Sequence, residues 1–466
     1  MMLVLPAARE RVRASDGDPG RTTRVLVGND FSEDVRTDRG WTGWWVQRIA
    51  WFAEEGDTLV LPTHPEEAFL AYVTALTGVR RETLSIVVPP TREGSEGTLS
   101  PARLADPEFV ASLAAAIGDR EVSHLSALWP DAAVARLART LGVRSAMPGY
   151  GFVDQAGGVL VNSKAVFRTI AGGAGVPMPE GAVCTSPEVA EEAILELLDG
   201  GPVVVKHDYM SGGRGNEILT TGEQFRPIGA RRVIRVAGRE DVRAYLRERW
   251  DWLTSGGRGR PVAERYVRDS SAYFSEFLVT DEGVEFTGDG ELLSAPYAVG
   301  QIMPSQGLEP EVLGRIVEGG RRLGEALRAL GYRGVLGPDT IVTPEREVLF
   351  TEYNGRVTGS THIHGRIGRF AVGDGFGKDR VILERVWPEG WSTPSFSAAL
   401  DTLRQAGLAY DPATRTGVVL TNAFDNNNGV MYCVVAADLS SAWSCDRTLK
   451  TLFAVSEQSV GGSDRI

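Results

Sequence analysis

Cysteine is scarce in this chain of 466 residues, where only Cys184, Cys433 and Cys445 occur. They form no Cys-x-x-Cys pair, so the sequence indicates neither a zinc site nor a disulfide framework, and a reducing compartment fits. Long apolar runs are missing as well, since no stretch approaches the length of a membrane span. The apolar start of the chain is too short for a signal peptide and lacks a basic beginning. We therefore expect a cytoplasmic protein with no membrane partner.

Positive charge is in the minority. The chain has 49 Lys and Arg residues against 61 Asp and Glu residues, a formal net charge of −12 and a pI of about 5.2. A general nucleic-acid surface needs the opposite sign, so we expect no nucleic-acid partner. The composition, 42% hydrophobic and 24% charged, is that of a globular protein, and the length allows two to four domains.

Two glycine motifs of nucleotide-binding proteins are missing too. The first predicted strand, residues 24–28, is followed by Asn29 and not by Gly-x-Gly-x-x-Gly, so the dinucleotide fingerprint is absent. A glycine-rich loop does occur at residues 211–215, but it lies between two predicted strands, whereas a Walker loop leads into a helix. Its backbone N–H groups could approach phosphates, and a hairpin tip without a ligand is an equally good interpretation of this loop alone.

What the chain does contain is a set of oxygen side chains on one predicted hairpin. Two β-prone runs, residues 339–342 and 348–353, flank a polar turn. A symmetric turn places Asp339 directly opposite Glu352, and the alternation along a strand puts Asn354 on the same face. Two carboxylates and an amide oxygen suit Mg²⁺, which also takes phosphate oxygens and water.

A solvated hairpin face is the alternative to this metal site. We favour the metal site because Ile341 and Phe350 are predicted on the same face, and large apolar side chains belong in the interior. Carboxylates held there would repel each other unless something positive lay between them.

Charged residues elsewhere are weaker candidates. Lys164 stands in the first turn of a predicted helix, against the helix dipole, and Lys206 ends an apolar strand before the glycine loop. Glu264 lies in a strand with apolar neighbours. Five residues are candidates for a polar wall beside the site, with a solvated helix as the alternative for the last four: His207, His362, His364, Arg366 and Arg369. Histidines at i and i+2 do not share a helical face, so no zinc pair is predicted.

The chain also shows how it is divided. Strands and helices alternate over residues 24–141, which predicts a layered α/β unit with parallel strands. The tryptophans at positions 41, 44, 45 and 51 have helical spacing, and a buried helix face is a better interpretation than a ligand box. Near the end, two apolar runs flank residues 425–429, a strong hairpin signal in a small C-terminal unit.

Taken in chain order, these features resemble the ATP-grasp ligases over about residues 150–370. The Glu-x-Asn-x-Arg string that begins at Glu352, with Asp339 upstream, is specific, whereas the lysines and the glycine loop are weak one by one. The layout is most similar to the pheganomycin-type peptide ligases, and the N-terminal α/β unit resembles their pre-ATP-grasp domain. The resemblance implies an α/β (α+β) architecture, with an ATP-grasp fold, an N-terminal Rossmann-like pre-ATP-grasp domain and a small C-terminal unit.

Four segments are expected on this basis. They are a flexible tail at residues 1–22, the pre-ATP-grasp domain at 23–150, the ATP-grasp domain at 151–370 with a lid at about 180–268, and a C-terminal domain at 371–466.

The resemblance also implies ATP and Mg²⁺ as cofactors and assigns roles to residues. Asp339, Glu352 and Asn354 would hold the metal, while Lys206 and Arg356 would act in catalysis, Arg356 by stabilising an acyl phosphate. The implied nucleotide contacts are Lys164, Lys206, Ser211, Gly212, Gly213, Gly215, Glu264, Tyr266 and Val267. In this set Glu264 would accept from the adenine amino group. The family's acidic ribose contact has no clear counterpart, since its candidates here are Asp269, Ser270 and Ser271.

The implied activity is an ATP-dependent carboxylate–amine ligase that forms a peptide bond through an acyl phosphate and releases ADP and phosphate. Its partners would be an amino acid-like acyl donor and the amine of an amino acid or peptide, in peptide antibiotic biosynthesis, with a homodimer left open. The alternatives are another ATP-grasp activity, such as a carboxylase or a polyglutamylating ligase, and a nucleotide-binding regulator without catalysis. A pure binder would not need Asp339, Glu352, Asn354 and Arg356 together.

Overall fold

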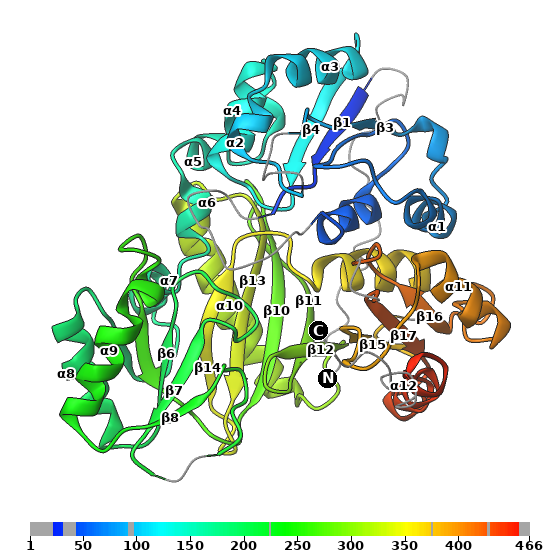
Figure 1. The fold of residues 1–466 in the computed structure, drawn as a ribbon. Coiled ribbons are helices and arrows are strands. Elements are labelled where there is room, and N and C mark those ends of the chain that lie inside the picture. The colour runs from blue at the N-terminus through cyan, green and yellow to red at the C-terminus, as the bar shows by residue number, and fades with distance from the viewer. Residues whose placement is uncertain are drawn as a thin grey trace, which may run out of the picture.

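The computed structural model describes residues 22–30, 43–91, 97–222, 225–373, 376–425 and 429–455. Except for Thr22, the predicted tail lies outside these ranges. The described chain forms sheets of four, eight and five strands. The four-stranded sheet lies at the top of Figure 1, the eight-stranded sheet lies below it, and the five-stranded sheet lies to the left. No helix in the described ranges is long and apolar enough to cross a membrane.

The N-terminal sheet confirms the predicted alternation of parallel strands and helices. Its order is β3-β2-β1-β4, and each neighbouring pair is parallel. Parallel neighbours need crossover connections, which here are mostly helical. The elements are β1 (Thr22–Val27), β2 (Thr58–Val60), α1 (Glu67–Thr77), η3 (Arg81–Thr83), β3 (Ser85–Val87), α2 (Pro101–Leu104), α3 (Pro107–Ile117), β4 (Glu121–Ala127), α4 (Ala132–Thr140) and η4 (Arg144–Ala146).

The tryptophan-rich segment forms the 3₁₀ helix η2 (Trp45–Phe52). Trp51 is 1% exposed, and its Nε1 donates to the carbonyl oxygen of Thr421 at 2.9 Å. Trp44 and Trp45 are half-buried, and Trp41 lies outside the described residues. The predicted buried helix face is therefore confirmed for Trp51, which joins the first unit to the end of the chain.

The central sheet is antiparallel throughout, in the order β14-β13-β10-β11-β12-β15-β17-β16. Its first five strands lie between residues 271 and 354, and the long helix α10 (Pro310–Ala329) packs on one face. The first five strands are β10 (Ser271–Val279), β11 (Val284–Ser294), β12 (Ala298–Met303), β13 (Gly334–Val342) and β14 (Val348–Asn354). The sequence predicts a core stripe on this helix made of Val312, Ile316, Leu323, Leu327 and Leu330. The first four are buried, whereas Leu330, which follows the last helical residue, is 55% exposed, so the stripe is confirmed except at its end.

The hairpin β13–β14 has the predicted opposition of acidic residues. Asp339 pairs with Glu352, and Gly337 pairs with Asn354. Nearer the turn the register shifts, because Thr340 pairs with Phe350 and leaves an extra residue in β14, a β-bulge.

The bulge corrects the predicted neighbours of Glu352. Phe350 was expected on the same face as Glu352, but it is 1% exposed in the core under α10, where a Cβ on Gly319 would touch its ring. Glu352 instead faces Lys164 on another element. Strict alternation would have placed Phe350 and Glu352 on one face of the sheet. The extra residue of the bulge places them on opposite faces.

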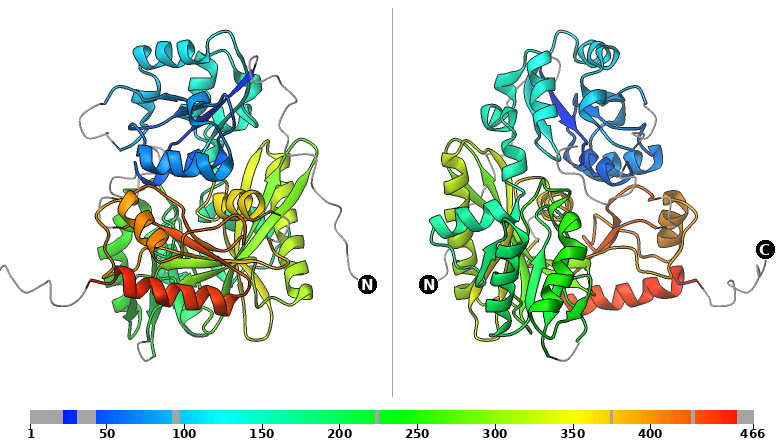
Figure 2. Two further views of the ribbon diagram at one scale, coloured as in Figure 1. Left: turned by 90° about the vertical axis from the view of Figure 1, so that its right-hand side faces the viewer. Right: turned by 60° about the vertical axis from the view of Figure 1, so that its left-hand side comes forward.

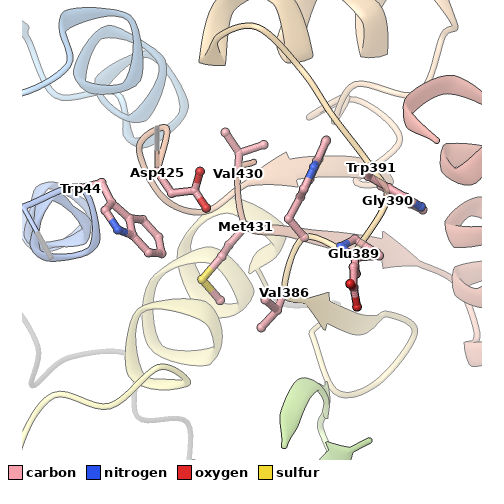
Figure 3. Close-up of a pocket in the computed structure, with 10 residues that line it drawn as sticks. Trp44, Val386, Glu389, Gly390, Trp391, Asp425, Val430 and Met431 are labelled. Atoms are coloured by element: carbon pink, nitrogen blue, oxygen red, sulfur yellow. The ribbon is translucent and has the colours of Figure 1, made fainter. Parts of the chain in front are cut away.

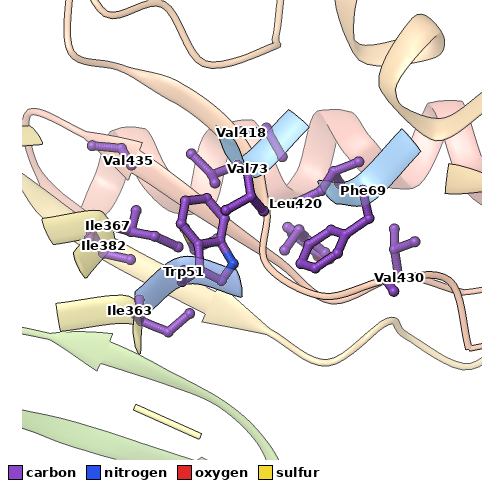
Figure 4. Packing of buried hydrophobic residues seen from close by; sticks show 14 of the residues in the cluster. Trp51, Phe69, Val73, Ile363, Ile367, Ile382, Val418, Leu420, Val430 and Val435 are labelled. Carbon is purple, nitrogen blue, oxygen red and sulfur yellow. The ribbon is translucent and has the colours of Figure 1, made fainter. Parts of the chain in front are cut away.

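The opposite face of the central sheet packs against the N-terminal unit and against the segment that contains Ile363 and Ile367. One buried cluster contains Trp51 and Phe69 from the N-terminal unit, Ile363 and Ile367, and Val418 from the last strands. Figure 4 shows these side chains converging from four different segments. The N-terminal unit is therefore fixed to the central sheet by a shared core.

The five-stranded sheet lies within the predicted lid. Its order is β5-β9-β6-β7-β8, and it packs against α8 and α9 through a separate core. The elements are β5 (Gly181–Val183), α8 (Pro187–Leu198), β6 (Val203–Lys206), β7 (Asn216–Thr220), β8 (Val233–Arg235), α9 (Arg239–Thr254) and β9 (Val262–Arg265). Three helices lead to it, namely α5 (Tyr150–Asp154), α6 (Gly157–Leu160) and α7 (Lys164–Gly173).

The C-terminal strands extend the central sheet. β15 pairs with β12, and the predicted hairpin of the last two strands is present as an antiparallel pair. Figure 2 shows α12 lying along this end of the molecule. The elements are η5 (Ile363–Val372), β15 (Val381–Arg385), α11 (Phe396–Gln405), β16 (Gly417–Leu420), β17 (Tyr432–Ala436) and α12 (Leu439–Phe453). The domain boundaries stay predictions, and the sheet is continuous across the one expected near residue 370.

Candidate active site

The predicted metal ligands lie on the edge hairpin of the central sheet, on the side of the lid (Figure 1). Asp339 and Glu352 are directly opposed, and Phe274 of the next strand lies opposite Asp339. Asn354 donates its amide N–H to Asp339 Oδ2 at 3.4 Å and to the carbonyl oxygen of Gly337 at 3.3 Å. The three predicted ligands are therefore brought together on one face.

The pKa values of the two carboxyl groups shift in opposite directions. Burial raises the pKa of Asp339 well above its usual range, and the adjacent Glu352 carboxylate raises it further. Burial acts in the same direction on Glu352, but the charges of Lys164 and Lys206 outweigh it and lower the pKa of Glu352. The pKa values of the two adjacent acids are thus driven apart, that of Asp339 upward and that of Glu352 downward.

Lys164 is the first residue of α7 and points at the hairpin. Its Nζ lies 2.8 Å from Glu352 Oε2 and donates to the carbonyl oxygen of Met210 at 2.7 Å. The helix begins here because Ser163 caps it, accepting from the N–H of Val166 at 3.1 Å. Glu352 and the carbonyl therefore offset the unfavourable place of a lysine at a helix N-terminus.

A second group of charges lies where the lid meets α7. Glu264 accepts from Lys206 through Oε1 and from Arg168 through Oε2, the latter at 3.1 Å, and its side chain is 3% exposed. Lys206 Nζ also lies 3.4 Å from the carbonyl oxygen of Thr351. Both oxygens of Glu264 thus have a cationic partner, and its expected contact with adenine stays a prediction.

Sequence reasoning missed Arg168. Its signal was available, because it stands four residues after Lys164 and so shares that lysine's helix face. Its guanidinium also donates to the carbonyl oxygens of Pro179 at 3.1 Å and Gly181 at 2.9 Å, at the start of the lid.

Arg356 lies where the N-terminal unit meets the hairpin. Its guanidinium donates to Asn162 Oδ1 and sits over the indole ring of Trp129, 4.6 Å from the centroid. The backbone N–H of Val357 donates to the carbonyl oxygen of Leu128 at 3.0 Å. Trp129 and Asn162 were not predicted, because they approach Arg356 only through the packing of separate elements.

The glycine loop is a turn between β6 and β7, which confirms the predicted strand–loop–strand arrangement. Gly212 and Gly213 have positive φ angles of 66° and 79°, and a Cβ on Gly213 would lie 2.7 Å from the backbone of Gly229. Glycine is therefore required there. The N–H of Ala298 in β12 donates to the carbonyl oxygen of Gly212 at 3.3 Å, so the loop touches the central sheet.

The predicted nucleotide-side residues after β9 form part of the lid surface. The N–H of Tyr266 donates to the carbonyl oxygen of Pro202 at 2.9 Å, and its ring stacks on Phe225 with 5.7 Å between centroids. The carbonyl oxygen of Val267 accepts from Ser270 Oγ at 3.0 Å. The ribose contact stays open.

The five polar-wall candidates are scattered. His207 is inside the lid, where its ring bonds to Ser255 and to backbone N–H groups. Arg366 and Arg369 donate to the carbonyl oxygens of Phe52 and Thr287. His362 and His364 are buried, and the ring of His364 bonds to the side chain of Glu276. Within the described residues these side chains do not form one wall.

A cavity of about 270 Å³ lies elsewhere, between η2 and the C-terminal strands (Figure 3). It is lined by Trp44, Val386, Trp387, Pro388, Glu389, Gly390, Trp391, Asp425, Val430 and Met431. None of these described residues is a predicted site residue.

The predicted ligand set fits Mg²⁺. Within the described ranges no three His, Cys, Asp or Glu side chains are gathered as a metal site. Two opposed carboxylates and an amide suit an ion that takes its other ligands from phosphates and water. Burial and the neighbouring Glu352 both raise the pKa of Asp339, so a cation between the two acids would relieve the cost of ionising them together.

Comparisons with known proteins bear on this geometry. Residues 46–143 match the family model of the Pre ATP-grasp domain, and residues 398–449 match the PGM1 C-terminal domain. The L-propargylglycine–L-glutamate ligase of Streptantibioticus cattleyicolor is 26% identical over 459 residues, 90% of each chain. The butirosin acyl-carrier protein–L-glutamate ligase of Niallia circulans is 24% identical over 325 residues, 68% of this chain and 65% of that one.

Solved structures show the same fold. The biotin carboxylase of Campylobacter jejuni has a TM-score of 0.58 at 14% identity, over 94% of this chain and 92% of that one. The biotin carboxylase domain of the Hydrogenobacter thermophilus 2-oxoglutarate carboxylase, with MgADP, has a TM-score of 0.57 at 15% identity, over 93% and 90%. The chain therefore has the ATP-grasp fold with a pre-ATP-grasp domain. The predicted fold and the resemblance to ATP-grasp ligases are both confirmed.

Proposed function

We propose that this protein is an ATP-dependent carboxylate–amine ligase that forms a peptide bond through an acyl phosphate and releases ADP and phosphate. The observation that carries the proposal is the opposed pair Asp339 and Glu352 beside cationic side chains. Lys164 and Lys206 lower the pKa of Glu352, and Arg356 favours ionisation of Asp339. Positive side chains around two carboxyl groups would allow further anions, a substrate carboxylate and a phosphate, to bind close together.

The chemistry follows from charge. A substrate carboxylate and the terminal phosphate of ATP repel each other, and positive side chains fixed in place offset that repulsion without reorganising. Bound Mg²⁺ would add to this by neutralising phosphate charge. Arg356, which contacts Asn162 and Trp129, would bind the acyl phosphate. The glycine loop at residues 211–215 would cover the phosphates and exclude water, which would otherwise hydrolyse the intermediate.

The substrates proposed are amino acids or short peptides in the cytoplasm. Both named relatives are ligases of L-glutamate, so glutamate is the first amino acid to test, as acyl donor or as amine. A peptide acceptor, a place in antibiotic biosynthesis and a homodimer are parts of the same proposal.

The test is to incubate the full chain with MgATP and pairs of amino acids and peptides that include L-glutamate, and to measure ADP, AMP and phosphate. We expect ADP and phosphate in equal amounts, dependent on both a carboxylate and an amine, with an amide product in the mass spectrum. Glu345→Gln, an exposed position on the same hairpin, is the matched control for Glu352→Gln. AMP as product, a requirement for bicarbonate, or tight ATP binding without turnover would reject the proposal.

A further inference from the structure

Glu276 is a buried acid beside the candidate metal site. The sequence did not predict a role for it, and none of the roles described above involves it. It lies on β10, two residues after Phe274, which pairs with Asp339. Side chains two apart on a strand share a face, so Glu276 points to the same side of the sheet as Asp339 and Glu352. It is 2% exposed.

The carboxylate of Glu276 has three side-chain partners. His364 Nε2 lies 2.6 Å from Oε1, while Thr361 Oγ1 and Thr358 Oγ1 lie 2.6 Å and 3.4 Å from Oε2. A carboxylate only accepts hydrogen bonds, so His364 carries its proton on Nε2 and Thr361 directs its hydroxyl hydrogen to Oε2. Thr358 makes the longer contact, and its hydroxyl oxygen also lies 2.7 Å from Ser360 Oγ. One buried carboxylate thus fixes the direction of two donors.

These donors come from the segment directly after Arg356. The N–H of Thr358 donates to Thr361 Oγ1 at 2.9 Å, and the N–H of Ser360 donates to Thr358 Oγ1 at 3.2 Å. A hydroxyl whose hydrogen is directed to Glu276 keeps its lone pairs for these N–H groups. The fold of residues 357–361 therefore depends on the anion beneath it.

The segment also meets the other parts of the site. A Cβ on Gly337, the partner of Asn354, would lie 3.3 Å from Thr358 Cγ2, and one on Gly359 would lie 3.7 Å from the ring of Trp45. The segment is thus packed between the metal-site face and the N-terminal unit, with Arg356 at its start. A shift of this segment would displace Arg356 from its place over Trp129.

We propose that Glu276 is a positioning residue for the ligase reaction, holding residues 357–361, and through them Arg356, beside the candidate metal site. The proposal rests on the proposed function. Leaving the buried carboxylate without its donors is unfavourable, so the interaction favours a single position of the segment. Reacting groups tolerate little misplacement, so losing the contacts of Glu276 should slow the chemical step and leave nucleotide binding unchanged.

The first arm of the test uses Thr361, where two substitutions separate the hydroxyl from the volume. Thr361→Ser keeps the donor, whereas Thr361→Val keeps the shape and removes it. We expect kcat to fall at least about tenfold in Thr361→Val and in Glu276→Gln, with the KM for ATP within threefold of wild type, and to be mostly retained in Thr361→Ser. Glu285→Gln, at an exposed position of β11, is the control.

The second arm measures backbone hydrogen exchange, which needs no substrate. The amides of Thr358 and Ser360 should exchange faster in Thr361→Val and Glu276→Gln than in wild type, Thr361→Ser or Glu285→Gln. Unchanged exchange would show that Glu276 does not hold the segment. Faster exchange with an unchanged kcat would show that the hydrogen bonds of Glu276 stabilise the segment without affecting the reaction. Each of these two results would overturn the proposal. A wild-type chain that releases no ADP with any substrate pair would instead reject the proposed function, and with it the catalytic part of this inference.

Discussion

Lys164 and Glu352 form an ion pair across the candidate site, with 2.8 Å between Nζ and Oε2. The lysine, predicted to bind phosphate, starts α7, and the glutamate, predicted to bind metal, lies on β14. Their side chains are only 7% and 18% exposed. The two charges therefore stabilise each other, and bound MgATP would offer each a further partner of the opposite sign.

Glu352→Gln should slow turnover severely while leaving the fold intact. The amide has nearly the same shape but no charge for a metal, and removing one such electrostatic group costs roughly 10²–10³-fold in rate. ADP release measured over a range of Mg²⁺ concentrations checks this, with Glu345→Gln as the control. A Glu352→Gln protein as active as the wild type would show that the metal assignment is wrong.

Lys206→Ala should weaken ATP binding. The lysine bonds to buried Glu264, and loss of a charge-assisted contact with phosphate is worth about 1.5–3 kcal/mol, or roughly 10–100-fold in the KM for ATP. Steady-state kinetics against ATP measure the effect, and Lys378→Ala at an exposed position is the control. Unchanged ATP kinetics would remove Lys206 from the phosphate site.

The sequence was most informative where the chemistry is local. Asp339 opposite Glu352, the capped helix at Lys164 and the strand–loop–strand form of the glycine loop all follow from patterns within about twenty residues. The same local logic placed Phe350 wrongly, because a β-bulge is one extra residue that alternation does not reveal.

The contacts between elements could not be predicted in the same way. Glu276 meets His364 across 88 positions of sequence, and Arg356 meets Asn162 across 194. Such pairs depend on how sheets and helices pack, which no periodicity encodes. Arg168 is the exception, since its spacing from Lys164 was visible.

Arg168→Met should loosen the junction between α7 and the lid. The guanidinium joins Glu264 to the carbonyl oxygens of Pro179 and Gly181, so its loss leaves three acceptors without this donor. We expect a higher KM for ATP and faster hydrogen exchange in β5 and β9, with partial recovery in Arg168→Lys, which keeps the charge. Equal exchange in Arg168→Met and wild type would show that the lid is held by other contacts.

Glu384→Gln should stabilise the protein increasingly as the pH rises. Burial raises the pKa of Glu384 in β15 from 4.5 to about 8, while a hydrogen bond from Gln301 partly opposes the rise. Between these values the unfolded chain loses a proton that the folded chain keeps, so the carboxyl group lowers the free energy of unfolding as the pH increases. The stability difference between Glu384→Gln and wild type should therefore grow by about 4 kcal/mol from pH 5 to pH 9. Urea unfolding at pH 5, 7 and 9 measures it, and a difference that stays constant would show that Glu384 ionises normally in the fold.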